Sequence, residues 1–265
     1  MRSKIVVVLG IIAIIALVVI VVYVRRGEMQ AKQTEEELFL YCGAGLRPPV
    51  SEMVGIFSTE YNVKIECNYA GSGALLSQVQ MTKRGDLFMP GDVFYIDLLE
   101  PTDLIESKHT VCYFIPVMLV RKDNPENIKS LEDLVKPGIR LGLGDPEVCA
   151  IGRKSARIFE KNNIEMEEVK KNLVFNSLTV DELGVQIKVG KVDAVIVWDS
   201  TAAYYLDSGD IVKIPRDKNI ISTVAIALLR SSKHKKLARD FINFVTSERG
   251  QEIFRKHHFS TELSE

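Results

Sequence analysis

Signatures of metal binding are scarce in this chain. It has four cysteines in 265 residues, which lie far apart at Cys42, Cys67, Cys112 and Cys149 and form no C-x-x-C pair. Paired cysteines are typical of zinc sites, so we expect no metal and no cofactor. One or two disulfides can form if the domain lies in an oxidising compartment, but the spacing selects no connectivity.

Motifs of catalysis and nucleotide binding are missing as well. The loops that follow the predicted strands contain no histidine cluster, no Ser-His pair and no phosphate-loop G-K-[ST]. The stretch "GSGALL" (Gly71–Leu76) lacks the third glycine of the dinucleotide fingerprint, because Leu76 stands in its place. We therefore expect a binding protein and not an enzyme.

A positive field is also missing. Four of the 34 basic residues lie in the first 26 positions, which leaves 30 basic against 35 acidic residues and a net charge of about −5 for the rest. This balance argues against nucleic acid as a partner. An anion bound here would have to be held by local geometry.

The N-terminus has one long apolar run. Ile5–Val24 contains twenty uncharged, mostly apolar residues, about the length that crosses a bilayer as a helix. The run ends at Arg25 and Arg26 without a small-x-small cleavage site. We predict that residues 1–26 are an uncleaved membrane anchor, with a removed signal peptide as the alternative, and that residues 27–36 are a polar tether.

The remaining chain alternates between strand and helix patterns. Strand-like segments such as "LFLYC" (Leu38–Cys42) and "DAVIVW" (Asp193–Trp198) are separated by amphipathic stretches of helical length. This order predicts an α/β fold with largely parallel sheets and helices on both faces.

Two long β-rich runs interrupt this alternation. They are Val111–Lys122 and Ile220–Arg230, about a hundred residues apart. Each is long enough to cross between two lobes. We predict that residues 37–116 and 222–262 form lobe 1 and that residues 117–221 form lobe 2.

The loops after the strands are the candidate binding segments, because ligands of open α/β sheets bind beyond the carboxyl ends of the strands. In "AGSG" (Ala70–Gly73), the Ser72 hydroxyl and the amides after it suit an anion. Alternatively, Gly71 makes a turn and Ser72 caps the next helix. The loop alone does not decide between these interpretations.

Five motifs together resemble a known family. "YCGAGL", "YAGSGALLSQV", "RGDLFMPGD", "LGLGDPEVCAIGR" and "VGKVDAVIVWDSTAA" follow the order and spacing of the periplasmic molybdate-binding proteins of ABC transporters, over Leu38 to about Ser260. The resemblance implies a two-lobed periplasmic-binding-protein fold of type II, with two crossover strands and the ligand in the interlobe cleft.

The resemblance also implies a set of ligand-binding positions. Ser72 matches the serine of the family's second loop, whereas Gly45 stands where the first loop has a serine and Trp198 where the family has a tyrosine. Backbone amides and the indole N–H would then donate in place of the missing hydroxyls. The implied ligand-binding residues are Ala44, Gly45, Ser72, Ile151, Val180 and Trp198.

Donors alone suit a fully deprotonated oxyanion, such as molybdate, tungstate or sulfate. Phosphate carries a proton at neutral pH and would need an acceptor, for which Glu147 and Asp199 are the candidates. We interpret Glu147 as part of a first helical turn and Asp199 as an N-cap or as a residue that orients Trp198. Two further expectations are that Arg153 lies on a helix surface and that Asp86 and Asp92 brace a loop through local hydrogen bonds.

These observations lead to one functional expectation. We expect a solute-binding protein, anchored to the cytoplasmic membrane by its N-terminal helix and lying on the extracytoplasmic side, that captures molybdate or tungstate as a monomer. It would deliver the oxyanion to an ABC transporter permease after hinge closure. The alternatives are a carrier of another anion (sulfate, phosphate or an organic anion) and a membrane-tethered ligand sensor.

Overall fold

The computed structural model of the protein describes residues 37–263. The predicted anchor and tether lie outside the described residues. Within the described part of the chain, no helix combines the length and the apolar character needed to cross a bilayer. Residues Glu37–Glu265 form one compact unit.

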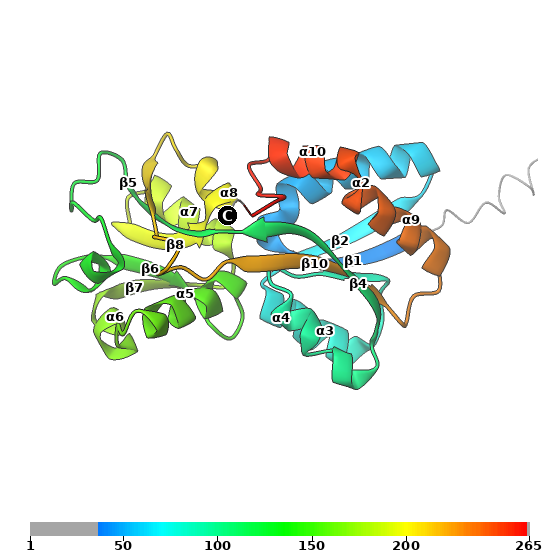
Figure 1. The fold of residues 1–265 in the computed structure, drawn as a ribbon, viewed down its shortest axis with the longest axis horizontal. Coiled ribbons are helices and arrows are strands. Elements are labelled where there is room, and N and C mark those ends of the chain that lie inside the picture. The colour runs from blue at the N-terminus through cyan, green and yellow to red at the C-terminus, as the bar shows by residue number, and fades with distance from the viewer. Residues whose placement is uncertain (1–36, 264–265) are drawn as a thin grey trace, which may run out of the picture. The chain divides into compact units, whose positions relative to one another are not determined.

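The unit is built on two five-stranded sheets, and the described chain passes between them (Figure 1). The first has the strand order β2-β1-β3-β10-β4 and the second β7-β6-β8-β5-β9. The strands of the first sheet are β1 (Glu37–Gly43), β2 (Lys64–Ala70), β3 (Leu87–Met89), β4 (Ile105–Phe114) and β10 (Ser222–Leu229). Those of the second are β5 (Pro116–Arg121), β6 (Leu141–Gly144), β7 (Leu173–Ser177), β8 (Ala194–Trp198) and β9 (Gly209–Lys213).

Both sheets are mixed, which corrects the prediction of largely parallel sheets. β1 runs parallel to β2 and β3, but β10 is antiparallel to β3 and β4. In the second sheet β6 is parallel to β7 and β8, whereas β5 is antiparallel to β8 and β9. The antiparallel pairs all involve the strands next to the crossings, which enter their sheets without an intervening helix.

Two crossings join the sheets. Only Ile115 separates β4 from β5, and the segment 214–221 leads from β9 back to β10 (Figure 1). This confirms the two-lobed α/β fold with two crossover strands. Lobe 1 denotes the first sheet with its helices, and lobe 2 the second. The predicted domain boundaries, at residues 116–117 and 221–222, stay predictions.

Helices connect most of the strands. Those of lobe 1 are η1 (Ala44–Leu46), α2 (Arg47–Tyr61), α3 (Ser72–Thr82), α4 (Phe94–Asp97), η2 (Glu100–Thr102), α9 (Lys235–Thr246) and α10 (Glu248–Lys256). Those of lobe 2 are η3 (Leu131–Val135), α5 (Ala150–Lys161), α6 (Met166–Asn172), α7 (Val180–Lys188) and α8 (Asp199–Ala203). The break between α9 and α10 occurs at Ser247, whose hydroxyl accepts the N–H of Gly250 at 3.3 Å.

Buried apolar side chains hold each lobe together and fix where its loops emerge. All five residues of β8 are buried, and α9 buries five of its apolar side chains against lobe 1. Each buried valine, leucine, isoleucine or phenylalanine side chain contributes about 1.5–3 kcal/mol when it is removed from water. All four cysteines are free thiols, so the disulfides considered from the sequence are not formed.

Candidate ligand-binding site

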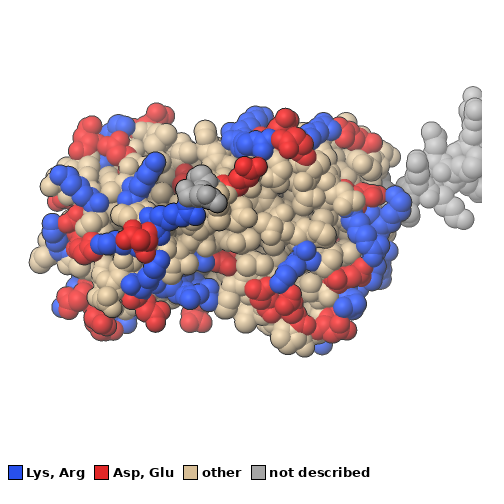
Figure 2. All heavy atoms as spheres, viewed as in Figure 1, with Lys and Arg blue, Asp and Glu red and all other residues tan. Residues whose placement is uncertain are grey.

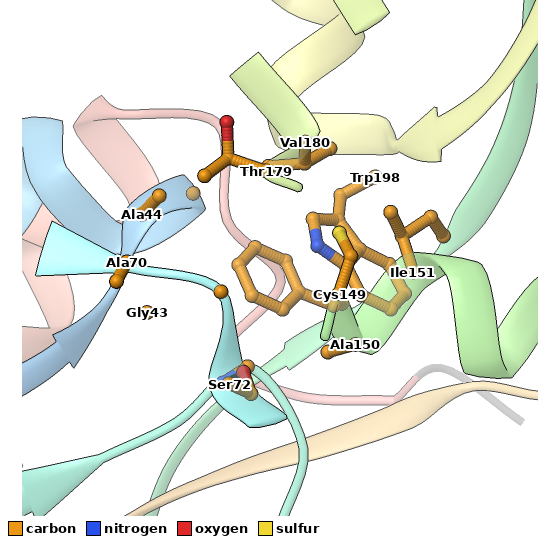
Figure 3. Close-up of a pocket in the computed structure, with 14 residues that line it drawn as sticks. Gly43, Ala44, Ala70, Ser72, Cys149, Ala150, Ile151, Thr179, Val180 and Trp198 are labelled. Carbon is orange, nitrogen blue, oxygen red and sulfur yellow. Dashed lines mark hydrogen bonds between the residues drawn. The ribbon is translucent and has the colours of Figure 1, made fainter. Parts of the chain in front are cut away.

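A small cavity lies between the lobes, at the ends of β1, β2, β4 and β8. Its volume is about 20 Å³, and its lining comes from both lobes (Figure 3). All of the lining side chains are neutral. They are Gly43, Ala44, Gly45, Ala70, Gly71, Ser72, Gly91 and Phe114 of lobe 1, with Cys149, Ala150, Ile151, Thr179, Val180 and Trp198 of lobe 2.

The six predicted ligand-binding residues, Ala44, Gly45, Ser72, Ile151, Val180 and Trp198, all line this cavity. That they bind a ligand stays a prediction.

Helix N-termini supply the polar character of the cavity. η1, α3, α5 and α7 all begin at or beside lining residues. The first amides of a helix have no acceptor within it, and they carry the positive end of the helix dipole. Acidic and basic side chains are interspersed over the outer surface in view, so that surface does not present one sign of charge to an anion (Figure 2). The helix N-termini can instead attract an anion to the cavity through their backbone dipoles.

Ser72 is held with its hydroxyl at the cavity. It is 3% exposed, and its Oγ accepts the N–H of Gly91 at 3.0 Å. The N-cap of α3 is Gly71, and Ser72 makes no capping hydrogen bond, so the capping interpretation is wrong. Since the oxygen already has a donor, the single hydroxyl hydrogen remains for a ligand.

The amide of Gly73 has a different role from the one expected. It donates to the carbonyl oxygen of Val148 at 2.8 Å, and this hydrogen bond joins α3 of lobe 1 to the loop before α5 of lobe 2. A Cβ at position 73 would lie 2.1 Å from the carbonyl oxygen of Glu147. The amide therefore holds the lobes together and is not available to a ligand.

The structure gives a reason for glycine at position 45. A Cβ there would lie 2.8 Å from Cγ1 of Val180 and 3.4 Å from Cδ1 of Trp198. The space of a first-loop side chain is thus taken by two residues of the other lobe. The absence of a side chain at position 45 therefore matches the size of Val180 and Trp198 opposite it.

Trp198 is fixed by stacking. Its ring lies 4.7 Å from that of Phe114, with 7° between the planes, and the residue is 2% exposed. Figure 3 shows the indole on the side of the cavity opposite Ser72, with its nitrogen towards the space between them. The indole N–H can therefore act as a positioned neutral donor.

Cys149 is a lining residue that we did not predict as a ligand-binding position. It is the N-cap residue of α5, and burial raises the pKa of its thiol to about 12, although hydrogen bonds from the amides of Gly152 and Ile151 lower it. The thiol is therefore neutral at physiological pH, and the Ile151 amide is directed at sulfur as well as lying at the cavity. The sequence signal that could have identified Cys149 as a lining residue is its position directly before α5.

The two candidate acceptors lie outside the cavity lining. Glu147 is exposed and precedes α5, so its assignment to a first helical turn is wrong. The carboxylate of Asp199 accepts the N–H of Ile115 at 3.2 Å, while its own N–H donates to the Ile115 carbonyl at 2.8 Å. Asp199 therefore braces the crossing, and the N-cap of α8 is Trp198.

Burial raises the pKa of Asp199 to about 6, against the effect of hydrogen bonds from Ser200, Ile115 and Ser260. Asp86 also differs from expectation. Its carboxylate accepts from the Phe39 N–H at 2.8 Å and from the Ser232 hydroxyl at 2.6 Å, both distant in sequence. Arg153 lies over the Phe94 ring of lobe 1, 3.2 Å from its centroid, so it contacts the other lobe.

Comparisons with known proteins agree with this architecture. The chain is 32% identical over 223 residues to a putative binding protein of Haemophilus influenzae, covering 84% of this chain and 90% of the relative. It is 26% identical over 199 residues to the molybdate-binding protein ModA of Mycobacterium tuberculosis, covering 75% and 74%.

A solved structure shows the same fold at low identity. The periplasmic binding protein AfuA of Actinobacillus pleuropneumoniae, with fructose-6-phosphate bound, matches with a TM-score of 0.75 at 15% identity, covering 86% of this chain and 85% of that one. Residues 38–260 match the family model described as bacterial extracellular solute-binding protein. The chain belongs to this family of bacterial extracellular solute-binding proteins.

Proposed function

We propose that this protein binds a compact, fully deprotonated tetrahedral oxyanion, molybdate or tungstate, in the interlobe cavity. The residues that would hold it are Ser72 and Trp198 through their side chains and, through backbone amides, Ala44, Gly45, Ile151 and Val180. Their common feature is that they are neutral donors at helix starts or strand ends.

The arrangement of Ser72 is the observation that carries the proposal. Its oxygen accepts the Gly91 N–H, which leaves the hydroxyl hydrogen free to donate to a ligand. No carboxylate lines the cavity to accept a proton from one. A dianion without protons only accepts hydrogen bonds and matches this lining, whereas the O–H of protonated phosphate would find no carboxylate in the lining to accept it.

The size of the cavity limits the size of the ligand in this conformation. One water molecule needs about 10–15 Å³ of such volume, and the cavity has about 20 Å³. A sugar phosphate such as that bound to AfuA is too large for it in this conformation. The relative named as a molybdate-binding protein is consistent with an ion of this class.

The role of the protein follows from its family and its two lobes. An anion that contacts donors of both lobes stabilises the closed arrangement, and the captured ion is then delivered to an ABC transporter permease. Stripping water from a dianion is costly unless every oxygen finds a donor, which the converging amides provide. We propose an extracytoplasmic location, a membrane anchor formed by the N-terminal segment, a monomeric state and no enzymatic activity.

Sulfate is the second candidate ligand. Val180 occupies the space that a side chain at position 45 would need, which makes this side of the cavity narrow. A narrower cavity favours sulfate over molybdate, because sulfate is the smaller of these two tetrahedral dianions.

Calorimetric titration of the full-length protein in detergent with molybdate, tungstate, sulfate and phosphate tests the proposal. We expect binding of molybdate or tungstate, weaker or no binding of sulfate and none of phosphate. If sulfate binds most tightly, the second candidate replaces the first. If none of the four produces heat or raises the melting temperature, the oxyanion function is excluded.

A further inference from the structure

A buried ion pair joins the two lobes beside the cavity. Nζ of Lys154, on α5 of lobe 2, lies 2.6 Å from Oδ2 of Asp92, in the loop between β3 and α4 of lobe 1. Each side chain is only 7% exposed. Of the ion pairs found among the described residues, this is the one in which both partners are buried to this extent.

Asp92 is also tied into lobe 1. Its Oδ2 accepts the hydroxyl of Ser222 at 2.9 Å and its Oδ1 accepts the N–H of Phe94 at 3.0 Å. The Phe94 contact is the local brace expected from the sequence, but the contacts of Oδ2 are distant. Ser222 begins β10, the strand that follows the second crossing. The carboxylate thus connects a cavity loop, a crossover strand and the opposite lobe.

The pair is close to the candidate ligand without lining the cavity. Asp92 directly follows Gly91, whose N–H holds the Ser72 hydroxyl. Lys154 lies one helical turn after Ala150, which lines the cavity. The contact that closes the lobes at this point also fixes the loop that orients Ser72.

The energetics of such a pair depend on closure. Separation of the lobes returns both charges to water, whereas closure buries them, at a cost that only their mutual attraction and hydrogen bonds offset. If Lys154 is removed, closure buries the Asp92 charge without its cationic partner and next to a bound anion. The lysine therefore favours the closed state specifically.

We propose that Lys154 is a positioning residue for ligand retention: through Asp92 it holds lobe 1 and lobe 2 together over the bound anion, which it does not touch. This inference rests on the proposed capture of an anion between the lobes. It predicts that Lys154 slows release of the ligand, since release requires the lobes to separate, and that it affects association much less.

The test compares four full-length proteins in detergent: wild type, Lys154→Met, Lys154→Arg and Arg157→Met. Arg157 is an exposed residue on the same helix, so its replacement removes an equal charge without touching the interlobe contact. Affinity is measured by calorimetry with the anion that binds wild type most tightly among molybdate, tungstate, sulfate and phosphate. Association and dissociation rates are measured by stopped-flow tryptophan fluorescence, because Trp198 lines the cavity.

We expect Lys154→Met to bind at least tenfold more weakly, with most of the loss in a faster dissociation rate. Lys154→Arg should recover most of the affinity, and Arg157→Met should stay within about twofold of wild type. A double variant, Lys154→Met with Asp92→Asn, should regain part of the affinity, because it no longer buries an uncompensated charge. Unchanged affinity in Lys154→Met, or an equal loss in Arg157→Met, overturns the inference while leaving anion binding intact.

A second measurement separates this inference from the function on which it rests. Spin labels on cysteines at Met81→Cys in lobe 1 and Leu206→Cys in lobe 2, both exposed positions, report the interlobe distance without any anion, in a background in which the half-buried free Cys67 is replaced by serine. If wild type binds none of the four anions, the proposed function fails. In that case Lys154→Met should still shift the distances to longer values, and identical distributions overturn the inference.

Discussion

The two lobes line the cavity in different ways. Lobe 1 presents mainly residues with little or no side chain, Gly43 to Gly45 and Ala70 to Ser72, whereas lobe 2 presents Ile151, Val180 and Trp198. The larger groups of lobe 2 fit into space that lobe 1 leaves free. How closely the lobes approach is therefore set by the missing Cβ atoms of lobe 1, and the polar contacts to a ligand depend on that approach.

Among the substitutions considered, Gly73→Ala should have the largest effect on how closely the two lobes approach. The new Cβ would lie 2.1 Å from the Glu147 carbonyl oxygen of lobe 2, and overpacking of this kind costs about 3 kcal/mol. We expect about 100-fold weaker anion binding by calorimetry.

Gly55→Ala is the matched control, because Gly55 lies in α2 of the same lobe with nothing within 4 Å of its added Cβ. Its affinity should equal that of wild type. Tight binding by Gly73→Ala would show that the lobes need not approach so closely.

Ser72→Ala removes the one hydroxyl that lobe 1 offers. Leaving an anion oxygen without its donor costs about 1–3 kcal/mol, so we expect a loss of roughly 5- to 150-fold in affinity. Ser72→Cys retains a weak donor and should lie between alanine and wild type. If alanine binds as tightly as serine, Ser72 serves only to hold Gly91.

Trp198→Phe tests the contribution of lobe 2. The substitution removes the indole N–H but keeps an aromatic ring to stack on Phe114. We expect a smaller loss, about 1 kcal/mol, because other donors surround the same anion. An effect larger than that of Ser72→Ala would make lobe 2 the dominant donor and reverse the comparison.

Asp199→Asn should have the smallest effect on binding and acts on stability. The folded-state pKa of about 6 lies above the ordinary value of 3.8 because of burial. The folded protein therefore holds a proton that the unfolded chain releases, and this carboxyl contributes stability below about pH 4 that is lost as the pH rises through 6.

The measurement is the melting temperature of wild type and Asp199→Asn between pH 4 and 7. The difference, wild type minus variant, should become more positive as the pH falls. A constant difference across this range would contradict the assigned pKa. The titrating carboxyl lies at the crossing, where it is hydrogen-bonded to Ile115.

Much of the fold was accessible from sequence, because apolar periodicity specifies strands and helices directly. The strand predicted at Leu38–Cys42, the strand predicted at Asp193–Trp198 and the crossing in Val111–Lys122 are examples. Strand direction was not accessible, since period-two alternation is the same in parallel and antiparallel strands. For this reason we predicted largely parallel sheets, whereas both sheets are mixed.

The candidate site was likewise predictable from the sequence only in part. The residues after strands and at helix starts were predictable, because the topology brings those ends together. The partners of individual groups were not, since they lie in the other lobe or far along the chain. The Gly73 amide bonded to Val148, and Asp199 bonded to Ile115, are contacts that no local pattern encodes.

The glycines of lobe 1 carry a consequence for how this sequence can diverge. The groups nearest to a Cβ at Gly71 and Gly73 include backbone carbonyl oxygens of Leu178, Val148 and Glu147, which every amino acid possesses. No substitution in lobe 2 can make room for a side chain at either position. At Gly45 the nearest atom belongs to the Val180 side chain, so a larger residue there can be accommodated by a smaller one opposite. In related sequences, positions 71 and 73 should therefore stay glycine independently, while positions 45 and 180 should change together.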